Sequence, residues 1–201
     1  MALLLLLALA SAPPAPAAPQ RPPVITPVAP GDGIEVGPDM RPLHMQDAEI
    51  VTGFKVDAGV ETFVAAKLAE RRGKDAVGRL GATAGCAAIF AAARQAYEPE
   101  RAGYHVFFAR TARAVIPEPT LKALRRPFLG PEINALLAYL PKLQVTVNQD
   151  GAPILARIVR AAEDRLAANL AAAPEPAAAL RAEHLAEYEG LRAAGGCKAT
   201  R

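Results

Sequence analysis

The chain has 201 residues, a formal net charge of +3 and 52% hydrophobic residues, with alanine the commonest of them. The charge is mild and the basic residues occur in pairs such as Arg71-Arg72, which argues against a nucleic-acid-binding surface. Ser11 is the only serine, so a serine hydrolase with its G-x-S-x-G turn is excluded. The chain has no tryptophan and few other aromatic residues, which leaves little material for stacking sugars or bases.

The first twelve residues are typical of an export leader. The apolar run Leu3 to Leu7 is followed by small residues at Ala8, Ala10 and Ala12. This run is far shorter than the roughly 20 residues of a spanning helix, and no later uncharged segment reaches that length. We therefore predict a signal peptide at 1–12, a periplasmic or secreted protein and no transmembrane span. The alternative is an apolar tail that is never processed.

The organisation after the leader follows from its prolines. Residues 13–42 are rich in proline and alanine, and repeated proline removes backbone donors and fixes backbone angles. This stretch predicts a disordered linker. The remaining chain, about 155 to 160 residues, is long enough for one domain with a real core. We predict a helical domain at 43–194 and a flexible C-terminal tail at 195–201.

Helical periodicity dominates the first half of this domain. A first helix is predicted to begin at an N-cap on Asp47, with a break or kink at Gly53 and Gly59. The next pattern is predicted to stop at Gly73, which follows a basic turn. The glycine- and alanine-rich residues 75–97 indicate a tightly packed or weakly stable helix. Residues 103–115 carry aromatic side chains at three- and four-residue spacing, which favours a central core helix.

The second half is predicted to be helical as well. Residues 116–143 indicate two short helices separated by Pro127 and Gly130-Pro131, with Pro131 suited to the first turn of the second helix. Residues 143–147 alternate like a strand, but a solitary strand has no partner, so a helix or an extended linker is favoured. Residues 154–170 form the cleanest amphipathic helix, for which core packing is the favoured interpretation. Its apolar stripe consists of Leu155, Ile158, Val159, Ala162, Leu166 and Leu170. A last helix follows the prolines at 174–176.

One segment of this half resembles a known family. The register begins with Thr120 to Leu124 and continues with Phe128, Pro131, the pair Leu136-Leu137 and Pro141. It is similar to the pattern of the domain of unknown function 2059 family, which comprises small exported bacterial proteins. The resemblance implies an all-helical exported domain without an established activity. It also implies a structural motif, in which the aromatic residue packs, the proline begins a helix and the leucine pair faces the core.

The two cysteines, Cys86 and Cys197, are the candidates for a disulfide. In an oxidising compartment this bond would tie the C-terminal tail to the second helical region and stabilise the fold by roughly 2 to 4 kcal/mol. The alternative is two unrelated thiols, one buried and one on a loose tail.

A weak metal motif lies where the linker meets the first helix. Met40, His44 and Met45 cluster there, and thioether and imidazole ligands suit copper(I) in an exported protein. Their spacing matches no established motif. The favoured interpretation is that Met45 packs and His44 is solvated, so we predict no bound metal and no cofactor.

Signals of catalysis are weak throughout the chain. Cys86 as a nucleophile would need His105 or His44 folded against it, and its alanine neighbours give no sign of an electropositive site. Asp57 and Glu61 lie four residues apart, which is typical of an exposed like-charge pair on a helix. No constellation therefore favours an enzyme.

We predict an all-α, compact multi-helix bundle that acts by interaction, as a periplasmic accessory or binding protein for an envelope partner or an apolar ligand. This hypothesis predicts an exposed apolar groove lined from Phe107, Phe108, Leu136, Leu137 and Leu166. Two alternatives stay open at this point: an enzyme whose site is assembled from distant helices, and a purely structural bundle. The sequence specifies no oligomeric state.

Overall fold

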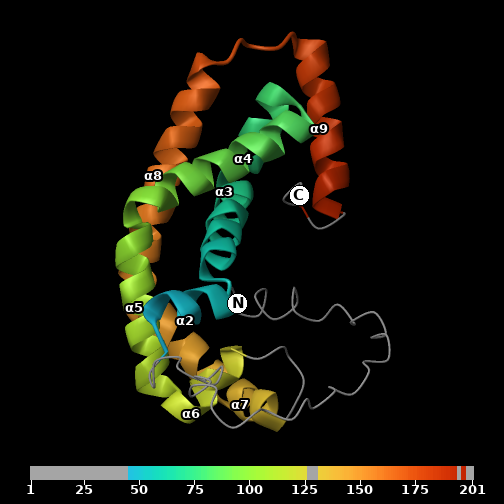
Figure 1. Ribbon diagram of the computed structural model, residues 1–201. Coiled ribbons are helices and arrows are strands. Elements are labelled where there is room, and N and C mark those ends of the chain that lie inside the picture. Colours follow the sequence, from blue (N-terminus) through green and yellow to red (C-terminus); the bar gives the residue numbers. More distant parts are fainter. Residues whose placement is uncertain (1–44, 126–130, 194–195, 198–201) are drawn as a thin grey trace, which may run out of the picture.

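The computed structural model describes residues 45–125, 131–193 and 196–197, and the regular elements within this part of the chain are all helical (Figure 1). The all-α prediction is therefore confirmed. The predicted signal peptide at 1–12 and the linker at 13–42 lie outside the described residues, as does most of the predicted tail.

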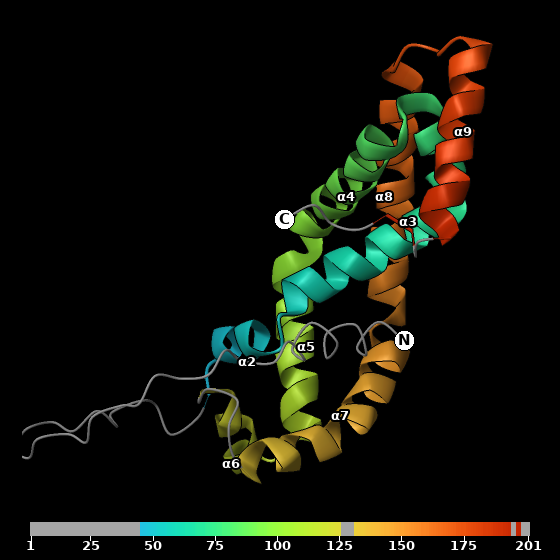
Figure 2. The same ribbon diagram turned by 90° about the vertical axis from the view of Figure 1, so that its right-hand side faces the viewer.

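The helices form a bundle in which α3 touches most of the longer elements. In chain order they are α2 (Asp47–Gly53), α3 (Val56–Leu80), α4 (Ala82–Tyr97), η1 (Glu98–Glu100), α5 (Arg101–Val115), α6 (Glu118–Leu121), η2 (Lys122–Arg125), α7 (Pro131–Asp150), α8 (Ala152–Ala172) and α9 (Ala178–Ala193). The pair α3 and α4 forms a helical hairpin, against which α8 packs, and α9 lies along α3 (Figures 1 and 2). At the other end α5 packs against α2 and α7.

The boundary between α2 and α3 lies close to the predicted position. Helix α2 begins after Gln46, whose backbone N–H donates to Glu49 Oε2 at 2.8 Å. The predicted cap, Asp47, is instead the first helical residue. The break follows Gly53 and includes Lys55, a left-handed residue with φ of 50°. An αL residue ends regular helix geometry, which separates the two helices.

The predicted break at Gly59 and the predicted helix stop at Gly73 are wrong. Helix α3 continues through both glycines and ends at Leu80, and its C-cap is Gly81, whose φ of 82° favours glycine. A Cβ atom on Gly73 would lie 3.1 Å from Tyr188 Cε2, and one on Gly78 would lie 3.1 Å from Leu185 Cδ2. These glycines therefore make room for α9 rather than ending α3.

The hairpin of α3 and α4 is as tightly packed as its small residues indicate. A Cβ atom on Gly85 would lie 2.9 Å from backbone atoms of Ala76 and Val77. Ala92 and Ala93 of α4 are fully buried. Backbones that approach this closely leave no space for a side chain at the crossing, so the glycine is a packing requirement.

The aromatic helix α5 lies in the core as predicted. Tyr104 and Phe108 are buried, and the ring of Phe108 meets Phe54 edge-on with centroids 5.4 Å apart. Such edge-to-face pairs stabilise a fold by more than the burial of their apolar area alone would give. Helix α5 thus joins α2 to the centre of the bundle.

The two helices predicted within residues 116–143 correspond to the α6–η2 segment and to α7, but α7 is longer than the short helix expected. Pro131 begins it, as predicted, but the helix then runs for 20 residues and passes through Pro141. Residues 143–147 are helical, so the strand alternative is wrong and the helix alternative is confirmed. Proline removes only one helical hydrogen bond, and the buried side chains of Leu140 and Leu143 hold the turn on either side.

Helix α8 confirms the amphipathic pattern in full. All six residues of its predicted apolar stripe are buried. Gly151, which precedes α8, lies close to the ring of Phe107. A Cβ atom on Gly151 would be 3.0 Å from Phe107 Cε1. The contact between Gly151 and Phe107 therefore positions the start of α8 against α5.

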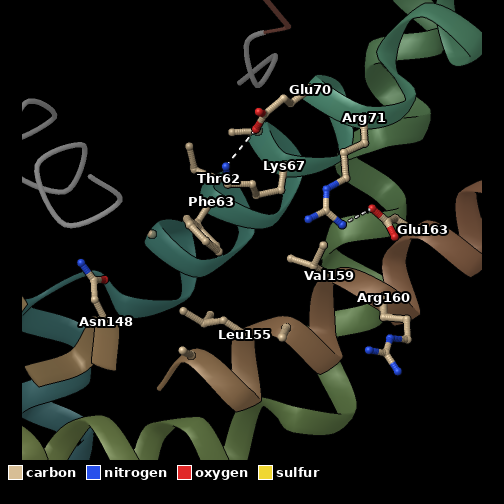
Figure 3. A pocket seen from close by; sticks show the side chains of 14 residues that line it. Thr62, Phe63, Lys67, Glu70, Arg71, Asn148, Leu155, Val159, Arg160 and Glu163 are labelled. Carbon is tan, nitrogen blue, oxygen red and sulfur yellow. Dashed lines mark hydrogen bonds and ion pairs between the residues drawn. The ribbon is translucent and has the colours of Figure 1, made fainter. Parts of the chain in front are cut away.

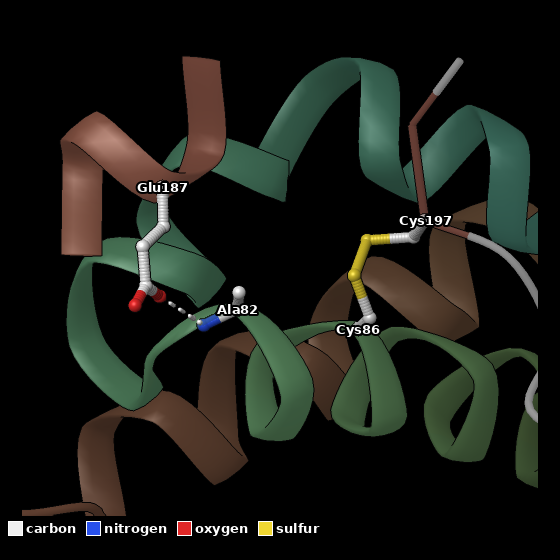
Figure 4. Close-up of a disulfide and its surroundings, with 4 residues drawn as sticks. All are labelled: Ala82, Cys86, Glu187 and Cys197. Carbon is white, nitrogen blue, oxygen red and sulfur yellow. Dashed lines mark hydrogen bonds between the residues drawn. A yellow bond between two sulfur atoms is a disulfide. The ribbon is translucent and has the colours of Figure 1, made fainter. Parts of the chain in front are cut away.

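Helix α9 packs on the outside of α3 and contributes no fully buried residue to the core. None of its residues is buried. Glu187 accepts the N–H of Ala82 at the start of α4 at 3.3 Å (Figure 4). Arg79 of α3 forms an ion pair with Glu175 just before α9. After α9, Cys197 forms a disulfide with Cys86 of α4, with Cα atoms 5.4 Å apart (Figure 4).

We predict that Gly85→Ala lowers the free energy of unfolding by about 2 kcal/mol, because the new Cβ atom overpacks the backbone of α3. The matched control is Gly103→Ala in α5, where a Cβ atom would meet nothing within 4 Å. That change should stabilise the protein by about 0.5 to 1 kcal/mol through helix propensity. Urea unfolding of both variants measures the difference. Equal free energies of unfolding for the two variants would contradict the close approach of α4 to the backbone of α3 at Gly85.

We also predict that the double variant Cys86→Ala/Cys197→Ala loses about 4 kcal/mol of stability, since the bond closes a loop across a separation of 111 residues. Hydrogen exchange should accelerate in α9 more than in α8, because α9 has no buried residue. A reductant should lower the Tm of the native chain and leave that of the double variant unchanged. Unchanged exchange in α9 would show that the other contacts suffice.

Candidate functional site

A groove of about 800 Å³ lies between α3 and α8 (Figure 3). Phe63 of α3 faces Leu155 and Val159 of α8 across an apolar floor. The lining residues of α3 run from Gly59 to Arg71, which corresponds to about 18 Å at the rise of an α-helix. The groove therefore extends over about three helical turns.

Small residues on both walls create this space. Ala66 of α3 and the pair Ala152 and Ala156 of α8 line the groove and are exposed. A methyl side chain does not reach across to the facing helix, whereas larger side chains would interdigitate and fill the gap. The buried stripe of α8 fixes the helix on the core, and its alanines leave the adjacent face open.

Charged side chains form the rim of the groove. Lys67 donates to Glu70 on the same helix at 2.9 Å. That hydrogen bond lowers the pKa of Glu70, so this carboxyl is ionised at neutral pH. Arg71 of α3 donates to Glu163 of α8 at 2.8 Å and closes one end of the groove (Figure 3).

Of the two remaining residues at the rim, one is neutral and the other is positively charged. Asn148 of α7 lies at the opposite end from the Arg71–Glu163 pair (Figure 3). Arg160 of α8 is exposed and forms no ion pair with any residue that the structure describes. The lining therefore holds two neutralised pairs and one unneutralised guanidinium.

The groove predicted from the sequence is not this one. Phe108, Leu136 and Leu166 are core residues with exposed fractions of 1%, 4% and 0%, so they cannot line an open surface. Phe107 is partly buried against Gly151, and Leu137 is 45% exposed on α7. The leucine pair therefore faces the core through Leu136 only. Helical spacing marks an apolar face, but it does not show which part of that face stays uncovered.

The weak copper motif is not assembled by the described residues. Met45 is buried, its N–H donates to Glu118 Oε1 at 2.6 Å, and its carbonyl accepts from Arg113 at 2.7 Å. Met45 therefore packs, as the favoured interpretation had it. Met40 and His44 lie outside the described residues. Within residues 45–125, 131–193 and 196–197, no group of three or more His, Cys, Asp or Glu could hold a metal ion.

A second constellation, which sequence reasoning missed, is centred on Asp57 in the first turn of α3. Tyr97 of α4 donates to Asp57 Oδ1 at 2.9 Å, and Arg101 of α5 donates to Oδ2 at 2.6 Å. His105 Nε2 lies 2.5 Å from Oδ1. The prediction of an exposed like-charge pair is wrong, because Asp57 has these partners and Glu61 pairs with Arg94 at 3.4 Å.

The electrostatics of this cluster indicate a structural role. Burial raises the pKa of Asp57, but hydrogen bonds from Arg101, His105 and Tyr97 outweigh it and lower the pKa overall. Burial and the hydrogen bond to Asp57 raise the pKa of the Tyr97 phenol. Burial raises the pKa of the neighbouring Tyr104 to about 12. At neutral pH an ionised carboxylate is thus held by its donors, and it joins α3, α4 and α5.

A smaller hollow of about 580 Å³ lies between α3 and α9 and shares Ala66 and Glu70 with the groove. Lys74, Glu189 and Arg192 line it together with the disulfide. Its wall is more polar than the floor of the α3–α8 groove. The nucleophilic role of Cys86, which the sequence disfavours, is not open to it here because its sulfur is in the disulfide.

No family model, curated protein or solved structure matches this chain. The resemblance of residues 120–141 to the domain of unknown function 2059 family stays a prediction from the sequence. Among the residues described, no helix has both the length and the apolar character to cross a bilayer. The function is therefore argued from the geometry of the groove.

We predict that Asp57→Asn lowers the free energy of unfolding by about 1 to 2 kcal/mol at pH 7, because it removes the charge that binds Arg101. The native pKa of Asp57 is below its unfolded value, so its contribution is complete above the unfolded pKa and disappears as the pH falls through the native pKa. Unfolding measured from pH 7 into acid should therefore show the two proteins converging.

The matched control for this prediction is Glu61→Gln, which removes a looser and more exposed pair and should change stability little. A stability difference between the native chain and Asp57→Asn that stays constant into acid would show that the charge is not its source.

Proposed function

We propose that this protein is exported to the periplasm or beyond the cell and acts there as a non-catalytic binding protein, with the α3–α8 groove as its ligand site. The observation that carries this proposal is an uncovered apolar floor beside a well-packed core. Its volume of about 800 Å³ lies within the range of known ligand pockets, about 300 to 1,000 Å³. Apolar lining with a few charged groups at the rim is typical of such sites.

Export is supported by two independent features of the chain. Residues 1–12 have the pattern of a leader, with an apolar run followed by small residues. The Cys86–Cys197 disulfide joins distant segments of the fold. Structural disulfides persist in oxidising compartments and are rare in a reducing cytosol.

Binding rather than catalysis is supported by the state of the reactive side chains. Cys86 is oxidised, and the carboxylate of Asp57 is occupied by donors from two other helices. The charged groups nearest the groove are mostly held in ion pairs at its rim. Apolar burial is therefore the main interaction that this site offers to a ligand.

We predict that the neutral apolar probe N-phenyl-1-naphthylamine binds the full chain with enhanced fluorescence. The variant Ala66→Glu/Ala156→Glu should weaken this binding by at least about tenfold, because it places one carboxylate on each wall beside the apolar floor. The control variant Ala114→Glu/Ala168→Glu places the same charges on exposed positions outside the groove and should bind normally.

Thermal melting of both double variants distinguishes lost binding from lost folding. Equal probe binding by the two variants would overturn the groove as the ligand site. An absence of probe binding by the native chain would overturn the proposed function itself.

A further inference from the structure

We infer that the α3–α8 groove selects a single-chain anionic amphiphile, a fatty carboxylate, whose head group is bound by Arg160. This inference rests on the proposed function, and it adds the chemical class of the ligand. Three properties of the groove carry it: the charge of the rim, the closure of the ends and the character of the floor.

The rim carries one positive charge that no acidic side chain of the lining neutralises. Lys67 and Arg71 are paired with Glu70 and Glu163, at 2.9 and 2.8 Å. Arg160 lies on the same rim and has no ion-pair partner among the described residues. One monovalent anion would therefore neutralise the lining. A guanidinium is well suited to this task, because its planar donors match the two oxygens of a carboxylate.

The ends of the groove favour a thin ligand of limited length. The ion pair of Arg71 and Glu163 spans the two walls at one end, and Asn148 of α7 stands at the other (Figure 3). A partner helix with side chains is about 10 to 12 Å across and would have to displace the ion pair to pass. A single extended chain fits between these ends along the floor of about 18 Å.

The floor offers contacts suited to methylene groups. Phe63, Leu155 and Val159 supply the apolar surface of the floor. Beside it, Ala66 and Ala156 line the groove with short methyl side chains that leave the floor accessible. Each methylene that leaves water for such a surface adds a similar favourable increment, so affinity should rise with chain length until the groove is filled. Thr62 of α3 also lines the groove beside Phe63, so the lining carries a hydroxyl group next to this apolar surface (Figure 3).

The test compares three amphiphiles with the same twelve-carbon chain: laurate, dodecanol and dodecyltrimethylammonium. Each is titrated against the neutral probe bound to the full, oxidised chain, below the concentration at which it forms micelles. We expect laurate to displace the probe at about a tenfold lower concentration than dodecanol, and the cation to be the weakest. Octanoate should be weaker than laurate.

Variants then assign the head-group contact. Arg160→Gln should weaken laurate about fivefold and leave dodecanol unchanged. The matched control, Arg165→Gln, removes an exposed arginine of α8 that lies outside the groove, and should change neither ligand. Both Arg160→Gln and Arg165→Gln change exposed side chains, so the core should stay intact. Thermal melting of the two variants checks that their stability is unchanged.

The outcomes separate the inference from the proposed function. Equal displacement by all three amphiphiles, or laurate binding that is insensitive to Arg160→Gln, would overturn the carboxylate while the neutral probe still marks a ligand groove. If the neutral probe does not bind, or binds the Ala66→Glu/Ala156→Glu variant equally well, the groove itself is overturned as a ligand site.

Discussion

The approach of α4 to the backbone of α3 at Gly85 is the contact on which the rest of the bundle depends. A Cβ atom there would lie 2.9 Å from the backbone of Ala76 and Val77, so the two helices meet without intervening side chains. Helix α8 packs against both members of this hairpin. The position of α8 relative to α3, and therefore the width of the groove, follows from how closely the hairpin closes.

Helix α3 is fixed at both of its ends by different kinds of interaction. At its first turn, Asp57 accepts hydrogen bonds from α4 and α5. Near its last turns, Gly73 and Gly78 admit the side chains of α9. A binding wall on a helix that is held at each end is positioned more accurately than one on a loop. The apolar groove is thus built on one of the best-anchored segments of the fold.

Sequence reasoning succeeded where local periodicity decides structure. The stripe of α8 and the aromatic core helix α5 were predictable, because burial of one helical face imposes a repeat of 3.6 residues. Sequence reasoning failed where residues distant in the chain determine the local structure. Gly73 has the local signature of a helix stop, yet the residue that explains it is Tyr188 on α9.

The candidate site was predictable only in part, for the same reason. Phe63, Leu155 and Val159 were recognisable as apolar residues of their helices, but the uncovered space between them depends on how α3 and α8 cross. The cluster around Asp57 is assembled from residues of three helices that no spacing rule connects. Such hydrogen bonds follow from the tertiary arrangement and leave no periodic signal.

The disulfide also has a consequence for the order of events in folding. Cys197 follows Cys86 by 111 residues, so the bond can form only after almost the whole helical domain has been synthesised. Until then Cys86 carries a free thiol, whose thiolate can attack a disulfide of another molecule and form a mixed disulfide with release of that molecule's second thiol. A chain that is cut or stalled before Cys197 lacks the intramolecular partner for this thiol. The bonding state of Cys86 therefore reports whether the segment that carries Cys197 has joined the fold.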